Sequence, residues 1–165
     1  MTWSWQGRGL EAGGGAGGGP GAGAGAVEVM LVSSRRKPSE YVFPKGGWET
    51  DEALEDAAAR ETVEEAGVRG ALEALDGPRC SGGGASASRE GGFLFTSKRN
   101  GSCRAHMFVM LVVEELDVWP ECGQRQRAWF SLPEARAALR KEWMRAALDS
   151  LEDMLEGGRL ALAVP

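Results

Sequence analysis

Residues 46–68 read GGWETDEALEDAAARETVEEAGV and contain residues that favour the start and the end of a helix. Thr50 suits an N-cap because its hydroxyl can accept a hydrogen bond from a backbone N–H of the first turn, and acidic residues follow it directly. Gly67 suits the C-terminal stop because glycine readily adopts the left-handed conformation that ends many helices. The sequence therefore predicts a helix over Asp51–Ala66.

Three glutamates of this predicted helix share one side. Glu61, Glu64 and Glu65 stand at positions i, i+3 and i+4, so their carboxylates project in nearly the same direction. Like charges so placed destabilise a helix unless a cation lies among them. Clustered carboxylates suit Mg²⁺ or Mn²⁺, and bound Mg²⁺ is often shared with substrate phosphates. The alternative is a solvated acidic face, which is the commoner reason for three glutamates taken alone.

The residues around these glutamates have a recognisable spacing. It is similar to the Nudix box, G-x5-E-x7-R-E-U-x-E-E-x-G-U, where U is a bulky aliphatic residue. At ordinary residue frequencies, a match at every fixed position arises by chance on the order of once in 10⁸ starting points. Thr62 departs from the preferred aliphatic residue, which concerns packing rather than chemistry. The fixed positions are Gly46, Glu52, Arg60, Glu61, Glu64, Glu65 and Gly67.

Resemblance to the Nudix hydrolases implies an α+β fold in which a mixed β-sheet is sandwiched between α-helices, an α/β/α sandwich. It also implies an enzyme that cleaves a phosphoanhydride bond with Mg²⁺ or Mn²⁺ as cofactor. The box would form a loop, a helix and a second loop that hold the metal against a diphosphate.

The resemblance further implies a role for each box residue. Glu61 and Glu65 would be metal ligands, joined by the backbone carbonyl of Lys45. Glu64 would deprotonate the attacking water, and Arg60 would hold the carboxylates through charge-assisted hydrogen bonds. The remaining box positions, which would support the loops, are Gly46, Glu52 and Gly67.

One branch of the family is especially similar, the diphosphoinositol polyphosphate and diadenosine polyphosphate hydrolases, including plant members. The sequence leaves open which of these substrates is used, and equally 5-phosphoribosyl diphosphate or inorganic polyphosphate, because all present the same bond and similar charge. The segments that carry the resemblance lie within about residues 27–155; they are Leu31–Pro38, Phe43–Glu49, Trp119–Glu121, Arg127–Phe130 and Trp143–Leu148.

The same resemblance implies a set of phosphate-binding residues. They are Ser34, Arg35, Arg36 and Arg104. A highly charged substrate needs several cations besides the metal, and the run Arg35–Lys37 could supply them. The alternatives are a solubilising turn for this run and a strand-edge charge for Arg104. We therefore expect a polyphosphorylated small molecule as the partner.

The chain divides by composition into three parts. Residues 1–26 are Gly-rich and predicted to be disordered, residues 27–156 form the Nudix domain, and residues 157–165 form a tail. Family members normally carry a further strand before Val27. Either that strand is missing here, or Thr2–Gln6 replaces it across a long linker.

Other elements follow from periodicity and turn residues. A capping box formed by Ser131 and Glu134 starts a final helix with an apolar stripe that extends to Leu155. Pro78–Gly92 is predicted to be a flexible loop, and His106, the only histidine, to have a structural role. The predicted strands begin at Val27 and continue with Tyr41–Phe43, Ala71–Leu75, Phe93–Ser97, His106–Leu116 and Arg127–Phe130.

Composition limits the possible partners and compartments. A net charge of −5 argues against a general nucleic-acid binder, and no apolar run reaches the length of a membrane span. The three cysteines form no C-x-x-C pair and fit reduced thiols. We expect a monomer in the cytoplasm or nucleus, with the mitochondrion as the alternative.

Two other functions compete with the enzyme. A weakly active or inactive Nudix domain could bind polyphosphate or a partner protein, and a purely structural acidic domain would bind neither Mg²⁺ nor Mn²⁺. The complete set of Glu61, Glu64 and Glu65 favours the enzyme, whereas the atypical N-terminus keeps the binding domain in contention.

Overall fold

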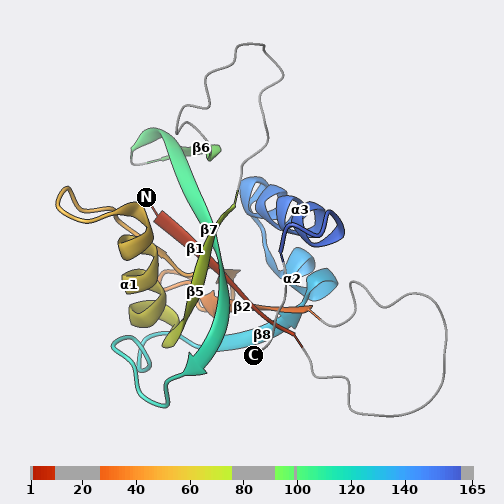
Figure 1. The fold of residues 1–165 in the computed structure, drawn as a ribbon. Helices are drawn as coiled ribbons and strands as arrows, with labels where there is room; N and C mark the ends of the chain where they lie inside the picture. Colours follow the sequence, from red (N-terminus) through yellow and green to blue (C-terminus); the bar gives the residue numbers. More distant parts are fainter. Residues whose placement is uncertain (1, 10–26, 76–91, 99, 161–165) are drawn as a thin grey trace.

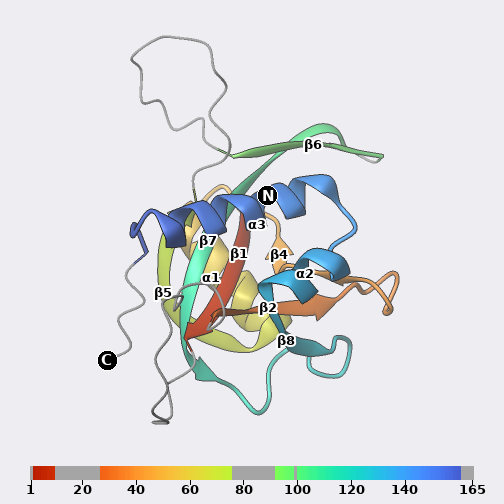
Figure 2. The ribbon, with the colours of Figure 1, turned by 90° about the vertical axis from the view of Figure 1, so that its right-hand side faces the viewer.

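The computed structural model describes residues 2–9, 27–75, 92–98 and 100–160 (Figure 1). A mixed sheet forms the middle layer, with strand order β3-β2-β1-β7-β5; β4 pairs with β1, β8 with β2 and β6 with β7. Helix α1 lies on one side of this sheet, and α2 and α3 lie on the other, as Figure 2 also shows. This arrangement confirms the expected α+β fold with a sheet between helices.

The predicted strands occur in the expected order, with β5 and β7 longer than predicted, and β4 is an additional short strand. The element bounds are β1 Thr2–Gly9, β2 Val27–Ser33, β3 Tyr41–Val42, β4 Lys45–Gly46, α1 Leu54–Ala66, β5 Val68–Leu75, β6 Phe93–Ser97, β7 Gly101–Glu115, β8 Arg127–Ser131, α2 Leu132–Ala138 and α3 Glu142–Glu156. The predicted loop Pro78–Gly92 falls almost entirely outside the described residues.

The N-terminal strand β1 lies in the centre of the sheet. It runs antiparallel to β2, where Gly7 pairs with Val29, and parallel to β7, where residues 2–7 pair with residues 106–111. The prediction of a disordered segment is therefore wrong for residues 2–9, and a replacement strand is the alternative that the structure contains. Without β1, the inner edges of β2 and β7 would lack backbone partners, which is costly in a sheet.

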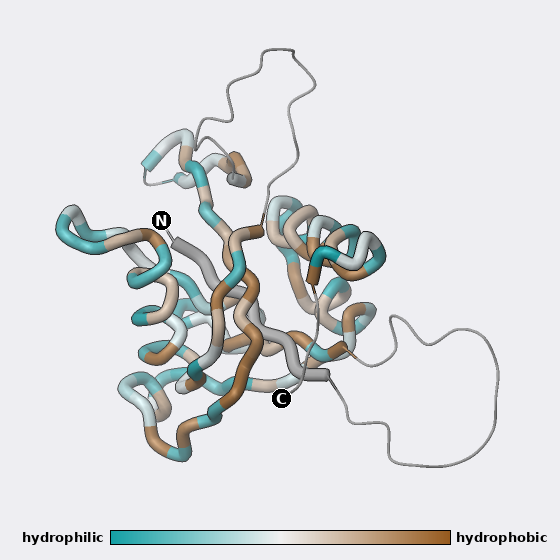
Figure 3. The backbone as a smooth tube through the Cα atoms, in the orientation of Figure 1, coloured by the Kyte–Doolittle hydropathy of each residue, from teal (hydrophilic) through white to brown (hydrophobic). Residues whose placement is uncertain are grey.

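The core lies on both faces of β2 and beneath the C-terminal helices. Residues 29–32 of β2 are fully buried, which explains why this strand is apolar without strict alternation. On the side of the sheet away from α1, helix α3 packs on the core through Met144, Leu148 and Leu151, which are all fully buried. In Figure 3, hydrophobic residues follow much of β7, and hydrophilic residues form the loop before α1.

The C-terminal helical region is two helices rather than the single one predicted. The capping box is confirmed, because Ser131 and Glu134 bond each other at the start of α2. Leu139 then adopts an extended conformation with ψ of 115° and buries its side chain completely. The chain thus changes direction while its apolar stripe stays on the core. None of the helices in the described ranges is long and apolar enough to cross a membrane.

The box helix α1 begins later than predicted, at Leu54 rather than Asp51. Its N-cap is Ala53, and no side chain caps it. Thr50 is therefore not the cap; it lies in a turn that ends where the Glu52 carboxylate accepts the backbone N–H of Glu49 at 3.1 Å.

The end of α1 is where the sequence predicts it. Gly67 has a φ of 64°, and a Cβ there would come within 2.6 Å of the Trp119 ring, so glycine is required on both counts. The last turn contains no basic residue. Instead, Arg127 of β8 donates to the carbonyls of Ala66 at 2.7 Å and Gly67 at 2.9 Å, stabilising the negative end of the helix.

Candidate active site

The three box glutamates have different environments although they share one side of α1. The side chains of Glu65 and Glu61 are 7% and 14% exposed, whereas that of Glu64 is 44% exposed. Two carboxylates are therefore held within the protein, and one is open to solvent.

Glu65 is bound at both carboxylate oxygens. Its Oε2 accepts the backbone N–H of Lys45 at 2.9 Å, and its Oε1 accepts a hydrogen bond from the buried guanidinium of Arg125. Burial raises the pKa of Glu65, against the opposing effects of Lys45 and Arg125. The Lys45 amine lies 4.0 Å from Oε1, and burial lowers the pKa of this amine.

Glu61 lies against the backbone of β4. A Cβ on Gly46 would come within 1.6 Å of the Glu61 carboxylate carbon, so only glycine fits at this box position. Arg60 donates to Glu61 Oε1 at 3.0 Å, and burial raises the pKa of Glu61. The backbone at residues 45 and 46 therefore contacts both buried carboxylates.

Arg60 also joins the box loop to α1. It donates to both oxygens of Glu52, at 3.2 and 2.8 Å, and to the carbonyl of Gly47 at 3.1 Å. The bonds from Arg60 lower the pKa of Glu52. Trp48 is exposed and donates its indole N–H to the Glu52 carbonyl at 2.8 Å.

The donor set fits a hard divalent cation only when the backbone is included. Among the residues that the structure describes, no three His, Cys, Asp or Glu side chains converge as metal ligands. The buried Glu65 and the largely buried Glu61 instead contact the backbone of Lys45 and Gly46, where a carbonyl would add a hard oxygen donor. Each carboxylate oxygen keeps a second lone pair after accepting one hydrogen bond, so present contacts leave room for coordination.

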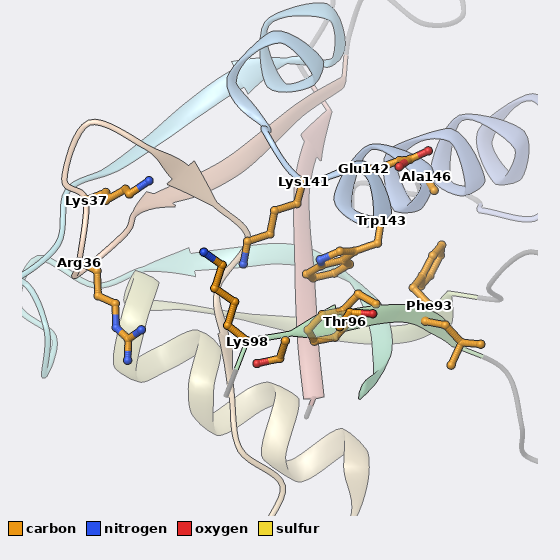
Figure 4. Close-up of a pocket in the computed structure, with 12 residues that line it drawn as sticks. Arg36, Lys37, Phe93, Thr96, Lys98, Lys141, Glu142, Trp143 and Ala146 are labelled. Atoms are coloured by element: carbon orange, nitrogen blue, oxygen red, sulfur yellow. The ribbon is translucent and has the colours of Figure 1, made fainter. Parts of the chain in front are cut away.

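A groove of about 880 Å³ is rich in cationic side chains (Figure 4). Arg36, Lys98 and Lys141 lie on one side in this view, with Trp143 on the other. Lys141 is close enough to the box to lower the pKa of Lys45 through its charge. The aromatic part is closed, because Trp143 is mostly buried and stacks on Phe95 with ring centroids 5.0 Å apart.

The structure separates the four predicted phosphate-binding residues. Arg36 lines the groove, but Arg35 pairs with Glu121 at 3.3 Å, and the backbone N–H of Ser34 donates to the Glu40 carbonyl. Arg104 lies on β7 opposite Leu94, which lines the groove, although Arg104 itself is not among the lining residues.

Sequence reasoning missed three cationic residues of this region. Lys98 follows β6, Lys141 precedes α3, and Arg125 precedes β8. Each is an isolated charge next to an element boundary, a pattern typical of solvated loop residues. Only the tertiary structure brings Lys98 and Lys141 to the groove and Arg125 to Glu65.

Comparisons with known proteins agree with this architecture. The structure of an Ap4A hydrolase binary complex from C. elegans superimposes with a TM-score of 0.60 at 17% identity, covering 94% of this chain and 98% of that one. A putative NUDIX hydrolase from Listeria monocytogenes gives a TM-score of 0.61 at 14% identity, covering 95% and 94%. At these identities the likeness concerns the fold alone.

Sequence relatives are closer. Nudix hydrolase 4 of Arabidopsis thaliana is 44% identical over 125 residues, covering 75% of this chain and 53% of that protein. Nudix hydrolase 17, mitochondrial, of the same plant is 45% identical over 130 residues, covering 78% and 63%. Diphosphoinositol polyphosphate phosphohydrolase 3-alpha of Mus musculus is 36% identical over 110 residues, covering 66% and 57%. The chain thus spans between about half and two thirds of the length of these relatives.

The family model for the NUDIX domain matches residues 22–151, which include the box, the cationic groove and most of α3. This match covers most of the chain and agrees with both the sequence relatives and the fold. The chain therefore belongs to the NUDIX domain family.

Proposed function

We propose that this chain hydrolyses a phosphoanhydride bond in a small molecule with many phosphates, with Mg²⁺ or Mn²⁺ as cofactor. Nudix hydrolases generally use one of these two cations. The proposal depends on two neighbouring regions of opposite charge. They are the box carboxylates and a groove with four cationic side chains. Such a pair suits a substrate with one reacting diphosphate and several other phosphates.

Within the box, the proposed roles follow from burial and contacts. Glu61 and Glu65, with the Lys45 carbonyl, would hold the cation, which when bound neutralises charge on the phosphate oxygens. The exposed Glu64 is the side chain that can reach a water molecule and take its proton. Arg60 fixes the position of the box loop relative to the helix, because it bonds both Glu52 and Glu61.

The groove favours phosphates over nucleobases. Its lining includes the cationic Arg36, Lys37, Lys98 and Lys141, with one carboxylate, Glu142. A base would need an exposed ring face, but Trp143 is buried against Phe95. We therefore place diphosphoinositol polyphosphates before diadenosine polyphosphates as substrates, in agreement with the name of the mouse relative.

For the compartment of this chain, the names of the relatives favour the mitochondrion over the cytoplasm and nucleus. Several Arabidopsis relatives carry "mitochondrial" in their names and one carries "chloroplastic", which supports the mitochondrial alternative and gives no support to the cytoplasm or nucleus. A monomeric state and the absence of nucleic-acid and membrane partners stay predictions.

A substrate panel tests the function. Phosphate or nucleotide release would be measured with Mg²⁺ for a diphosphoinositol polyphosphate, a diadenosine hexaphosphate and an ADP-sugar, with Glu64→Gln as the inactive control. We expect kcat/KM to fall in that order. Preference for the ADP-sugar would contradict the substrate class, and no metal-dependent hydrolysis of any compound would favour a domain that only binds polyphosphate.

A further inference from the structure

Arg125 is a buried arginine whose three guanidinium nitrogens contact three different parts of the chain. Its side chain is 4% exposed. Nη1 donates to the carbonyl of Ser33 at 3.0 Å, Nη2 donates to Glu65, and Nε donates to Glu121. The planar fork of an arginine can make these bonds at once, whereas a lysine amine cannot occupy all three positions.

Two of these partners, Ser33 and Glu121, connect Arg125 to the cationic loop Ser34–Lys37. Ser33 is the last residue of β2, and the segment Ser34–Lys37 begins directly after it. Glu121 uses its second carboxylate oxygen to accept a bond from Arg35 at 3.3 Å. The start of the loop and one of its arginines are therefore both fixed, directly or through one carboxylate, to the guanidinium of Arg125.

The third partner, Glu65, is one of the proposed metal ligands of the box. Glu65 is nearly inaccessible to solvent, so the protein must fix its carboxylate in one orientation. The backbone N–H of Lys45 fixes one oxygen and Arg125 the other. Glu121 is also tied to α1, because its backbone N–H donates to the Glu64 carbonyl at 3.1 Å.

We propose that Arg125 is a positioning residue that holds the Glu65 carboxylate and the loop Ser34–Lys37 in a fixed relation to each other. It sets the distance between the cation and the phosphate-binding charges through its bonds to Glu65, Ser33 and Glu121. This inference rests on the proposed function, in which Glu65 is a metal ligand. Partners of metal ligands typically affect metal affinity by about 10–100-fold, so loss of the guanidinium has a measurable consequence.

Arg127 provides a matched control. Its side chain is also largely buried, at 17% exposure, and it donates to the backbone carbonyls of Ala66, Gly67 and Leu116. Among the described residues, Arg127 contacts the carboxylate of Glu115, outside the box, at 3.7 Å. A change at Arg127 therefore tests what the loss of a buried structural arginine does by itself.

The experiment compares Arg125→Lys with Arg127→Lys in the full chain. Calorimetry would measure Mn²⁺ binding without substrate and tripolyphosphate binding in metal-free buffer, and thermal unfolding would measure stability. We expect Arg125→Lys to weaken Mn²⁺ binding by about 10–100-fold and to weaken tripolyphosphate binding severalfold. Arg127→Lys should lower the melting temperature and leave both affinities within about twofold, because Arg127 bonds neither the carboxylates of Glu61 and Glu65 nor the loop Ser34–Lys37.

A second variant covers the case in which Arg125→Lys does not fold. Glu121→Gln keeps the shape of the side chain but weakens its bonds to Arg35 and Arg125, so tripolyphosphate affinity should fall more than Mn²⁺ affinity. Both affinities unchanged in the folded variants would overturn the proposal. If the unmodified chain binds no Mn²⁺, the proposed function fails instead.

Discussion

The acidic face of α1 and the cationic groove are neighbouring regions of opposite charge that are built in opposite ways. Glu61, Glu64 and Glu65 lie within five consecutive residues, and one helix fixes their relative positions. The groove takes Arg36, Lys98 and Lys141 from three segments separated by tens of residues. In this chain, the chemistry proposed for the site is local in sequence, whereas the proposed selectivity depends on how the segments pack.

Strand β1 connects the two regions, so its removal should have the largest effect. It pairs with β4 at Lys45 and Gly46, at the start of the box, and with β7 from His106 onward, next to the part of β7 that pairs with the groove strand β6. Composition alone predicts that deleting the Gly-rich N-terminus hardly changes the melting temperature. With β1 in the centre of the sheet, we expect deletion of residues 1–9 to abolish cooperative thermal unfolding and activity.

Circular dichroism during heating measures this effect. A separate peptide of residues 1–9, added in excess, should restore part of the transition by pairing with β2 and β7. An unchanged melting temperature in the deleted chain would show that the central position of β1 is not needed for folding.

The acidic region should respond next most strongly, and unequally along the helix. Glu64→Gln keeps the shape of the side chain but cannot accept a proton from water, so turnover should fall by about 10²–10⁴-fold. Its Mn²⁺ affinity should stay close to that of the unmodified chain, because Glu64 is open to solvent and meets Arg60 only at 3.7 Å.

Glu65→Gln is the matched variant for the buried carboxylate. It should raise the Mg²⁺ concentration needed for activity, because a metal-binding oxygen loses its charge. Metal titrations followed by activity measurements separate the two variants. Equal effects on turnover and metal requirement would remove the proposed division between a base and a ligand.

The groove should show a smaller effect that depends on the substrate. Arg36 lines the groove, whereas its neighbour Arg35 is paired with Glu121. Arg36→Ala should raise KM about tenfold for the substrate with the most phosphates and hardly at all for an ADP-sugar, since each charge-assisted bond contributes about 1.5–3 kcal/mol. Salt should weaken binding of the same substrates most.

Steady-state kinetics of Arg36→Ala and Arg35→Ala test this difference between neighbours. The surface variant Arg69→Ala, which removes an exposed ion pair with Glu114, controls for a change in net charge. Equal increases in KM for Arg35→Ala and Arg36→Ala would contradict the proposed difference between the two arginines.

The smallest effect concerns the pH dependence of stability. Arg60 lowers the pKa of Glu52 below its ordinary value near 4.5, so the charged carboxylate stabilises the fold above that value. This stabilisation is lost as pH falls through the lower, folded pKa. The difference in melting temperature between the unmodified chain and Glu52→Gln should therefore be constant near neutral pH and disappear in acid. Lys141→Ala, in the groove, should keep the pH dependence of the unmodified chain.

Several features of the site could be predicted because neighbouring residues determine them. The end of α1 at Gly67 and the shared side of the three glutamates follow from glycine conformation and helical spacing. The start of α1 could not be predicted, because Arg60 holds Glu52 and draws the loop away from a local N-cap at Thr50. The position of Thr2–Gly9 in the sheet could not be predicted either. The composition of the N-terminus is dominated by the Gly-rich residues that follow, and it gives no information on the pairing of this strand with β2 and β7.

By itself, the sequence determined the family, the order of most elements and the residues of the box, because these depend on spacing within one helix and its two loops. Only the tertiary structure decided which carboxylates are buried, which of two adjacent arginines reaches the groove, and that Arg125 holds Glu65. Burial and long-range hydrogen bonds depend on what packs against a residue. Ser33, Glu65 and Arg125 are far apart in the sequence, and they come into contact only when the sheet and its helices have assembled.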